Sequence, residues 1–202
     1  MIPTCGPTGS GKSTTLSASL KEITRPDKKV VTVEDPIEFR LPGVVQVQVN
    51  SAPKEASKRV TFANTLREFL RQDPDVILVG ESRDDETANV AIQAALTAHL
   101  LLSTLHTNDA VGAVNRFKEL KVEPYLLAST LLEVVAQRLT RRNCPHCSEP
   151  VEPTEFGLAL FRTHGVPEEQ IKLQKGQGCD SGFTSVAPAA CAPWCPRILE
   201  SR

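Results

Sequence analysis

The feature that most constrains this chain is a glycine-rich motif close to its first residue. The motif has the form G-x-x-x-x-G-K-[ST] and runs from Gly6 to Ser13. Such a loop binds phosphate when it joins a buried strand to a helix, because its backbone N–H groups then point at the anion beside the positive end of the helix. A glycine-rich stretch can also be a surface turn. Here Leu16, Leu20 and Ile23 follow at helical spacing, which favours the strand, loop and helix arrangement.

The motif predicts a bound nucleoside triphosphate, with ATP and Mg²⁺ as the expected cofactors. Lys12 supplies a positive charge to the phosphates, and the Ser13 hydroxyl is an expected Mg²⁺ ligand. The predicted nucleotide-binding residues are Gly6, Pro7, Thr8, Gly9, Ser10, Gly11, Lys12, Ser13 and Thr14. Few residues precede the loop, and Pro3 among them has no N–H for a sheet ladder. We therefore expect the first strand to be largely missing and the chain to be cut at its front.

Apolar segments alternate with amphipathic ones along most of the chain, which predicts an α/β fold with a mostly parallel sheet flanked by helices. We expect strands over 30–34, 75–80 and 100–105, and an edge strand over 44–50 where valines alternate with polar residues. Helices are expected over 12–23, 61–71, 86–98, 110–120 and 124–139.

Polar side chains follow three of the predicted strands. Glu34, Glu81 and His106 stand at or just after strand ends, where ligands collect in parallel sheets. Either glutamate can serve as the base that polarises a water molecule, and Glu81 can also reach Mg²⁺; the sequence does not separate these roles. His106 is placed to sense a terminal phosphate. The competing interpretations are a turn acid, a helix-capping acid and a structural histidine.

Three arginines are candidates to stabilise negative charge during phosphoryl transfer. They are Arg67, Arg71 and Arg83, acting within the chain or on a neighbouring chain's nucleotide. The alternative is an ordinary surface or ion-pairing role. Basic and acidic residues number 23 and 24, so no basic stripe points to nucleic acid. A signal peptide and an apolar run of membrane-spanning length are also missing from the sequence, and we expect a cytoplasmic protein.

The character of the chain changes near Asn143. We expect an ATPase core over 1–142, a cysteine-containing appendage over 143–181 and an irregular tail over 182–202. Of the 6 cysteines, Cys144 and Cys147 have the C-x-x-C spacing of half a zinc site. In a chain without export signals such a pair indicates a metal or free thiols before a disulfide.

Together these motifs resemble the secretion ATPases of the type II secretion and type IV pilus assembly group (GspE/PulE-like), over roughly residues 4 to 181. The motifs are Gly6 to Ser13, Val33 to Phe39, Leu70 to Glu81, His99 to Asp109 and Gln137 to Leu139. The resemblance implies a RecA-like P-loop core. It also implies a hexamer at the cytoplasmic face of the inner membrane, where platform proteins are its partners and ATP hydrolysis drives pseudopilus or pilus assembly.

Carried over by motif, Gly6 to Ser13 resemble the Walker A loop, Glu34 to Glu38 the aspartate box, Glu81 the Walker B acid, and His99 and His106 the histidine box. Arg67 and Arg71 fall in the family's arginine-bearing helix. Assembly motors of the group often carry two C-x-x-C pairs that bind zinc, and Cys179 matches the start of the second pair. Its partner cysteine is missing, so Cys191, Cys195, His146 or His164 would have to complete the site.

The sequence leaves two hypotheses for this polypeptide. The first is a motor ATPase core that powers type II secretion or type IV pilus assembly. The second is a truncated, non-hydrolysing nucleotide-binding fragment of such a motor. A frameshift near Ser181 would explain both the lost cysteine and the composition of the tail. A DNA-translocating ATPase is disfavoured by the charge distribution.

Overall fold

The computed structural model describes residues 1–50, 52, 59–97, 99–140 and 148–176. These residues fall into two compact units, 1–138 and 139–176, which we describe separately. Among the described residues, no helix combines the length and the apolar character that a membrane crossing requires.

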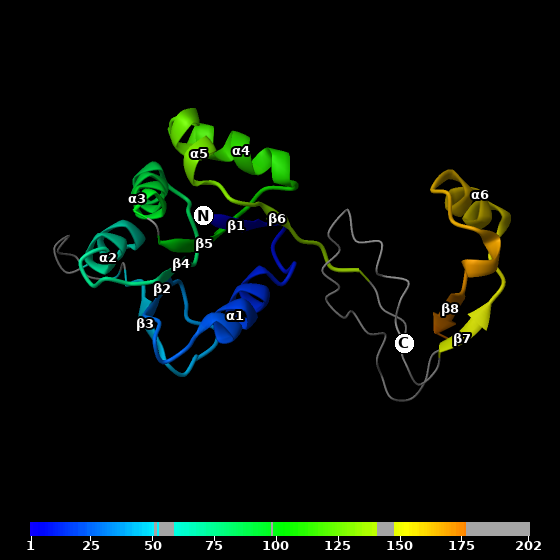
Figure 1. The fold of residues 1–202 in the computed structure, drawn as a ribbon, viewed down its shortest axis with the longest axis horizontal. Coiled ribbons are helices and arrows are strands. Elements are labelled where there is room, and N and C mark those ends of the chain that lie inside the picture. Colours follow the sequence, from blue (N-terminus) through cyan, green and yellow to red (C-terminus); the bar gives the residue numbers. More distant parts are fainter. Residues whose placement is uncertain (51, 53–58, 98, 141–147, 177–202) are drawn as a thin grey trace. The chain divides into compact units, whose positions relative to one another are not determined.

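The first unit is built on a six-stranded sheet with the order β3-β2-β4-β5-β1-β6 (Figure 1). Every neighbouring pair in this sheet is parallel. The strands are β1 (Ile2–Cys5), β2 (Val30–Glu34), β3 (Val44–Gln48), β4 (Val76–Val79), β5 (Leu100–Leu105) and β6 (Val135–Ala136). The expected parallel sheet is confirmed, with β3 at one edge.

Helices cover both faces of this sheet, because alternate residues of the central strands point to opposite sides. The helix α1 (Lys12–Ile23) lies on one face, where Leu16 and Leu20 pack with Val30 and Leu102. The opposite face carries α2 (Phe62–Phe69), α3 (Asp85–Leu96), α4 (Ala110–Glu119) and α5 (Pro124–Thr130). Buried side chains of these helices form a larger cluster with the strands, which includes Leu66, Phe69, Ile92, Phe117, Leu127, Val31, Ile77 and Leu101.

Side-chain caps fix where three of the helices begin. Thr61 accepts a hydrogen bond from the Asn64 N–H, and Asp84 accepts one from the Thr87 N–H at 2.7 Å. Asp109 caps α4 through the Gly112 N–H at 2.6 Å. Caps of this kind satisfy N–H groups that the first turn leaves free. Because Asp84 and Asp109 follow β4 and β5 closely, they also determine how quickly the chain turns away from the carboxyl edge of the sheet.

The prediction that the first strand is largely missing is wrong. Ile2–Cys5 form β1, which has the same length of four residues as β4 and pairs with β5 along its whole length. The carbonyl groups of Met1 and Cys5 accept hydrogen bonds on the β6 side, from Leu132 and Gln137. Backbone groups two residues apart face the same side of a strand, so the backbone nitrogen of Pro3, between Met1 and Cys5, also faces β6. Its lack of an N–H therefore costs no hydrogen bond to β5.

The predicted helix over 124–139 is also wrong in its second half. Helix α5 ends at Thr130, and Leu131 is already extended. The chain then runs beside β1, where Leu132 donates to the Met1 carbonyl at 2.9 Å and Val135–Ala136 form β6. The free edge of β1 offers backbone partners that a longer helix would leave unpaired, and the β-branched Val134 and Val135 suit an extended conformation.

The second unit is a small antiparallel pair with one helix. Strand β7 (Ser148–Val151) pairs with β8 (Leu173–Gly176), and α6 (Glu155–Thr163) and the 3-10 helix η2 (Glu168–Gln170) lie between them in sequence. Thr154 caps α6, and Arg162 pairs with Glu168 across the connection. The candidate zinc ligands Cys144, Cys147 and Cys179, and the tail over 182–202, lie outside the described residues.

Candidate nucleotide-binding site

A cavity of about 430 Å³ lies where the glycine-rich loop meets the carboxyl ends of β2, β4 and β5. Strands that run parallel end at the same edge of a sheet, so residues distant in sequence gather there. The lining comes from the loop and the start of α1 (Thr8 to Thr14, Leu16 and Ser17), from the end of β2 and the turn after it (Glu34, Asp35, Pro36 and Glu38), and from Phe62, Leu78, Gly80, Glu81, Thr104 and His106.

The loop has the backbone conformation that an anion site needs. Gly9 and Gly11 have φ angles of 78° and 81°, in the left-handed region that glycine adopts without strain. Gly11 is also the N-cap of α1, and no side chain of the described residues caps that end. The first turn of α1 contains no acidic residue. Its N–H groups and the helix dipole are therefore available to a negatively charged ligand.

Lys12 is held inside the loop as a largely buried cation, with 9% of its surface exposed. Its Nζ donates to the carbonyl groups of Gly6 at 2.9 Å and Pro7 at 3.2 Å. Burial lowers the pKa of Lys12, and the nearby charge of Glu81 partly opposes this effect. A cation that burial has stripped of water gains strongly from an anion, so the loop fits the phosphates of a nucleotide.

Glu81 is held between the side chains of Arg83 and His106. Its Oε1 lies 2.9 Å from Nε2 of His106, and its Oε2 lies 2.6 Å from Nε of Arg83. Only 15% of the Glu81 side chain is exposed, whereas Arg83 is 68% exposed. Both carboxylate oxygens therefore have a partner, and the acid at the end of β4 is fixed in orientation by groups that follow β4 and β5.

Glu34 stands at the end of β2 and is held on one side only. Its Oε1 accepts hydrogen bonds from Thr32 Oγ1 at 2.7 Å and from Gln46 Nε2 at 3.0 Å. Both hydrogen bonds that the described residues donate to the Glu34 carboxylate thus go to the same oxygen. The second oxygen keeps its capacity to accept, which distinguishes Glu34 from Glu81.

Side-chain and backbone groups of β5 hold the residues on each side of Glu81. Thr104 Oγ1 donates to the Gly80 carbonyl at 2.6 Å, and the Ser82 N–H donates to the Thr104 carbonyl at 3.3 Å. The buried hydroxyl groups of Ser82 and Ser103 lie 3.0 Å apart and share a hydrogen bond. The turn that presents Glu81 is therefore fastened to β5 at three points.

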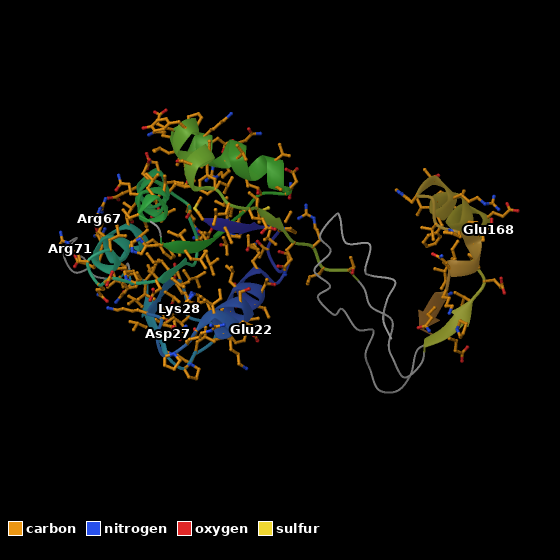
Figure 2. The ribbon with its side chains drawn as sticks, viewed as in Figure 1. Glu22, Asp27, Lys28, Arg67, Arg71 and Glu168 are labelled. Atoms are coloured by element: carbon orange, nitrogen blue, oxygen red, sulfur yellow. The ribbon has the colours of Figure 1, made fainter. Side chains whose placement is uncertain are left out.

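The predicted arginines are placed differently from the acids. Arg67, Arg71 and Arg83 lie outside the cavity lining. Arg67 forms an ion pair with Glu86 at 2.8 Å, and Arg71 lies 3.8 Å from Glu68. Figure 2 shows both side chains at α2, well separated from α1. Their role toward a nucleotide stays a prediction.

Of the remaining predicted residues, some line the cavity and others lie outside it. His99 lies away from the cavity, where its Nδ1 is 2.8 Å from Thr97 Oγ1 and 3.0 Å from the Ala94 carbonyl at the end of α3. Ser13 and Glu81 both line the cavity, as Mg²⁺ ligands would need to. The described residues contain no cluster of three or more His, Cys, Asp or Glu side chains arranged for a metal ion by themselves. A Mg²⁺ ion here would depend on phosphate oxygens and water for its other ligands.

Phe62, Thr104 and Gln137 are among the residues of the site that the sequence did not indicate as site residues. Phe62 and Thr104 line the cavity, and Gln137, the residue after β6, contacts the loop. Thr104 lies inside an apolar strand, and nothing in the sequence indicates which of its neighbours faces the loop. Gln137 lies within the segment predicted as a helix, so its approach to the loop depends on the pairing of β6 with β1.

Comparison with known proteins gives a consistent result. A family model described as "Type II/IV secretion system protein" matches residues 1–189. The chain belongs to this family. It is 51% identical over 179 residues to the type II secretion system ATPase E of Vibrio cholerae, covering 89% of this chain and 34% of that protein. It is also 51% identical over 178 residues to the type IV pilus assembly ATPase PilB of Thermus thermophilus, covering 87% and 19% of the two chains.

Solved structures support the same fold. The pilus retraction motor PilT with bound ADP has a TM-score of 0.59 and 38% sequence identity, covering 69% of this chain and 42% of that one. The ATPase DotB of Legionella pneumophila has a TM-score of 0.57 and 33% identity, covering 69% and 41%. These neighbours confirm the RecA-like secretion ATPase fold. The chain spans about a third of the type II secretion relatives that it matches, since it covers 34% of the Vibrio protein.

Proposed function

We propose that this chain binds ATP with Mg²⁺ in the cavity beside the glycine-rich loop and hydrolyses it to ADP and phosphate. The observation that carries the proposal is the gathering of Lys12, Glu34 and Glu81 around one cavity. A cation for the phosphates and carboxylates for water and metal are the groups that phosphoryl transfer requires of a protein. When bound, Mg²⁺ would neutralise charge on the phosphates, with Ser13 and Glu81 as its nearest candidate ligands.

The chain's own residues divide the remaining work. Lys12 and the first turn of α1 hold the phosphates, and Thr104 and the serine pair keep Glu81 in place. Glu34 has an oxygen without a partner among the described residues, which supports its assignment as the group that orients the attacking water. His106 contacts Glu81 and the cavity together, so it is placed to respond when a terminal phosphate arrives or leaves.

We further propose that the ATPase acts within a secretion or pilus assembly motor. The names of the relatives support this assignment, because they include ATPases of type II secretion and of type IV pilus assembly. A hexamer at the cytoplasmic face of the inner membrane, with platform proteins as partners, is the corresponding proposal for assembly. The exposed positions of Arg67 and Arg71 support it, since a neighbouring subunit could then receive them.

The decisive experiment is ATP turnover by the purified chain beside a Lys12→Ala variant. We expect a Mg²⁺-dependent rate in the first protein and a background rate in the second. Equal rates at background would refute autonomous hydrolysis. Binding of ADP, measured in the same samples, would then show whether the chain is the non-hydrolysing fragment of the second hypothesis.

A further inference from the structure

We propose that Gln137 is a positioning residue of the glycine-rich loop, which it holds at two separate points. Gln137 follows β6, the short strand on the outer side of β1, and only 3% of its surface is exposed. The inference rests on the proposed nucleotide-binding function, but the contacts that carry it belong to the protein alone.

The first point of attachment is the backbone at the start of the loop. The Gln137 N–H donates to the Cys5 carbonyl at 2.8 Å, directly before the motif. The Gln137 carbonyl lies so close to Gly6 that a Cβ at that glycine would stand 2.3 Å from its oxygen. The backbone of Gly6 thus packs directly against the backbone of Gln137, and no space is left for a side chain at Gly6.

The second point is the middle of the loop. Nε2 of Gln137 donates to the Ser10 carbonyl at 2.7 Å in a buried hydrogen bond. The reversed amide would place Oε1 against that carbonyl oxygen, and two acceptors repel, so only this orientation of the side chain fits. Gln137, directly after β6, therefore sets the separation between the start of the loop, at Cys5, and the turn at Ser10.

A second observation concerns atoms without partners. The buried side-chain atoms that lack a hydrogen bond among the described residues are Ser10 Oγ and Gln137 Oε1. Such atoms are few in native proteins, and each one needs an explanation. Both belong to the two residues joined by the Gln137 to Ser10 bond. The two unpaired atoms therefore mark the point where Gln137 meets the loop, at which a bound water or a ligand group would find two buried partners.

The test compares Gln137→Met with Thr130→Val in the full chain. Methionine keeps the length of glutamine and removes its donor. Thr130 is a matched control, because it is 4% exposed and its Oγ1 donates to the Leu126 carbonyl at 2.7 Å, outside the cavity. Amide hydrogen exchange of the loop, without nucleotide, and equilibrium binding of fluorescent ADP with Mg²⁺ are measured for both variants.

We expect Gln137→Met to exchange its loop amides about tenfold faster and to bind ADP about tenfold more weakly than the unchanged chain. Thr130→Val should alter neither quantity. Its urea midpoint should nevertheless fall by about as much as that of Gln137→Met, because each variant loses one buried hydrogen bond. Equal loop exchange in the two variants would overturn the inference. If the unchanged chain binds no ADP, the proposed function fails, and loop exchange still decides the role of Gln137.

A second variant covers the case in which Gln137→Met does not fold. Gln137→Glu has the same size, and it donates a hydrogen bond only when its carboxyl group is protonated. Burial favours the neutral form of such a group, so loop protection should return as the pH falls toward 5. Loop exchange equal to that of the unchanged chain, at a pH high enough to ionise the carboxyl group of Gln137→Glu, would also overturn the inference, because the carboxylate cannot donate.

Discussion

Replacing Gly6 with alanine tests the close contact between the glycine-rich loop and β6. Gly6 has a φ of 150°, in a region that residues with a side chain rarely adopt. The added Cβ would lie 2.3 Å from the Gln137 carbonyl oxygen and 2.7 Å from Ser10 Oγ. Real Cβ atoms do not approach backbone so closely, and the backbone of β1 or β6 must therefore move.

Two separate costs contribute to the expected destabilisation. A strained backbone conformation costs about 1–3 kcal/mol. Overpacking against rigid neighbours adds about 1–3 kcal/mol. The sum, about 2–6 kcal/mol, is a large share of the roughly 5–15 kcal/mol by which a domain is stable. Gly9→Ala is the matched control, since Gly9 has a φ of 78° and no atom within 4 Å of the added Cβ. Its cost is the left-handed conformation alone, about 1 kcal/mol.

Urea unfolding followed by circular dichroism measures both variants against the unchanged chain. A difference of about 3 kcal/mol between them corresponds to about 1–3 M in the urea midpoint. We expect Gly6→Ala to unfold at the lower concentration, with Gly9→Ala close to the unchanged chain. Equal midpoints for the two variants would refute the close approach of Gln137 and Ser10 to Gly6, because both sites carry a positive φ and only Gly6 has atoms within 4 Å of the added Cβ.

Two further predictions concern buried polar groups around the cavity. Lys12→Met should unfold at an equal or higher urea concentration at pH 7, because burial lowers the pKa of Lys12 and so costs the folded state. As the pH rises, Lys12 loses its proton in the folded state before it does so in the unfolded state, so the unchanged chain gains stability and the stability difference from Lys12→Met narrows. A Lys12→Met variant clearly less stable than the unchanged chain at pH 7 would contradict this. Ser103→Ala leaves Ser82 Oγ buried without its partner and should cost about 1–3 kcal/mol. Adding Ser82→Ala should cost less than two independent changes, and strictly additive midpoints would count against the shared hydrogen bond.

Local patterns predict much of this fold because β2, β4 and β5 are short and mostly apolar. The predicted bounds of β2, β4 and β5 lie within one residue of the observed ends, since each strand is a continuous buried run followed by polar residues. The same runs place Glu34, Glu81 and His106 at one edge, since parallel strands share an edge. These predictions need only the periodicity of single segments.

The errors arise where pairing between distant segments decides the structure. The residues over 131–136 contain leucine, valine and alanine, which suit a helix or a strand equally. They are extended because β1 presents a free edge, with carbonyl groups of Met1 and Cys5 that Leu132 and Gln137 satisfy. Thr104 and Gln137 enter the site through the same long-range pairing, so their part in it could not be read from their neighbours in sequence.

The charges around the cavity explain why the loop motif alone is an incomplete description of the site. Four carboxylates line the cavity, Glu34, Asp35, Glu38 and Glu81, against the cations of Lys12 and, when protonated, His106. Glu81 is already balanced by Arg83, whereas the acids that follow β2 have no comparable cation among the cavity lining. A triphosphate held by the loop would share this cavity with these acids, and like charges repel, although solvent screens the exposed Asp35 and Glu38 more than the half-buried Glu34. A divalent cation bound with the proposed nucleotide would offset this repulsion, so the acids at the strand ends support the proposal that the nucleotide binds together with Mg²⁺.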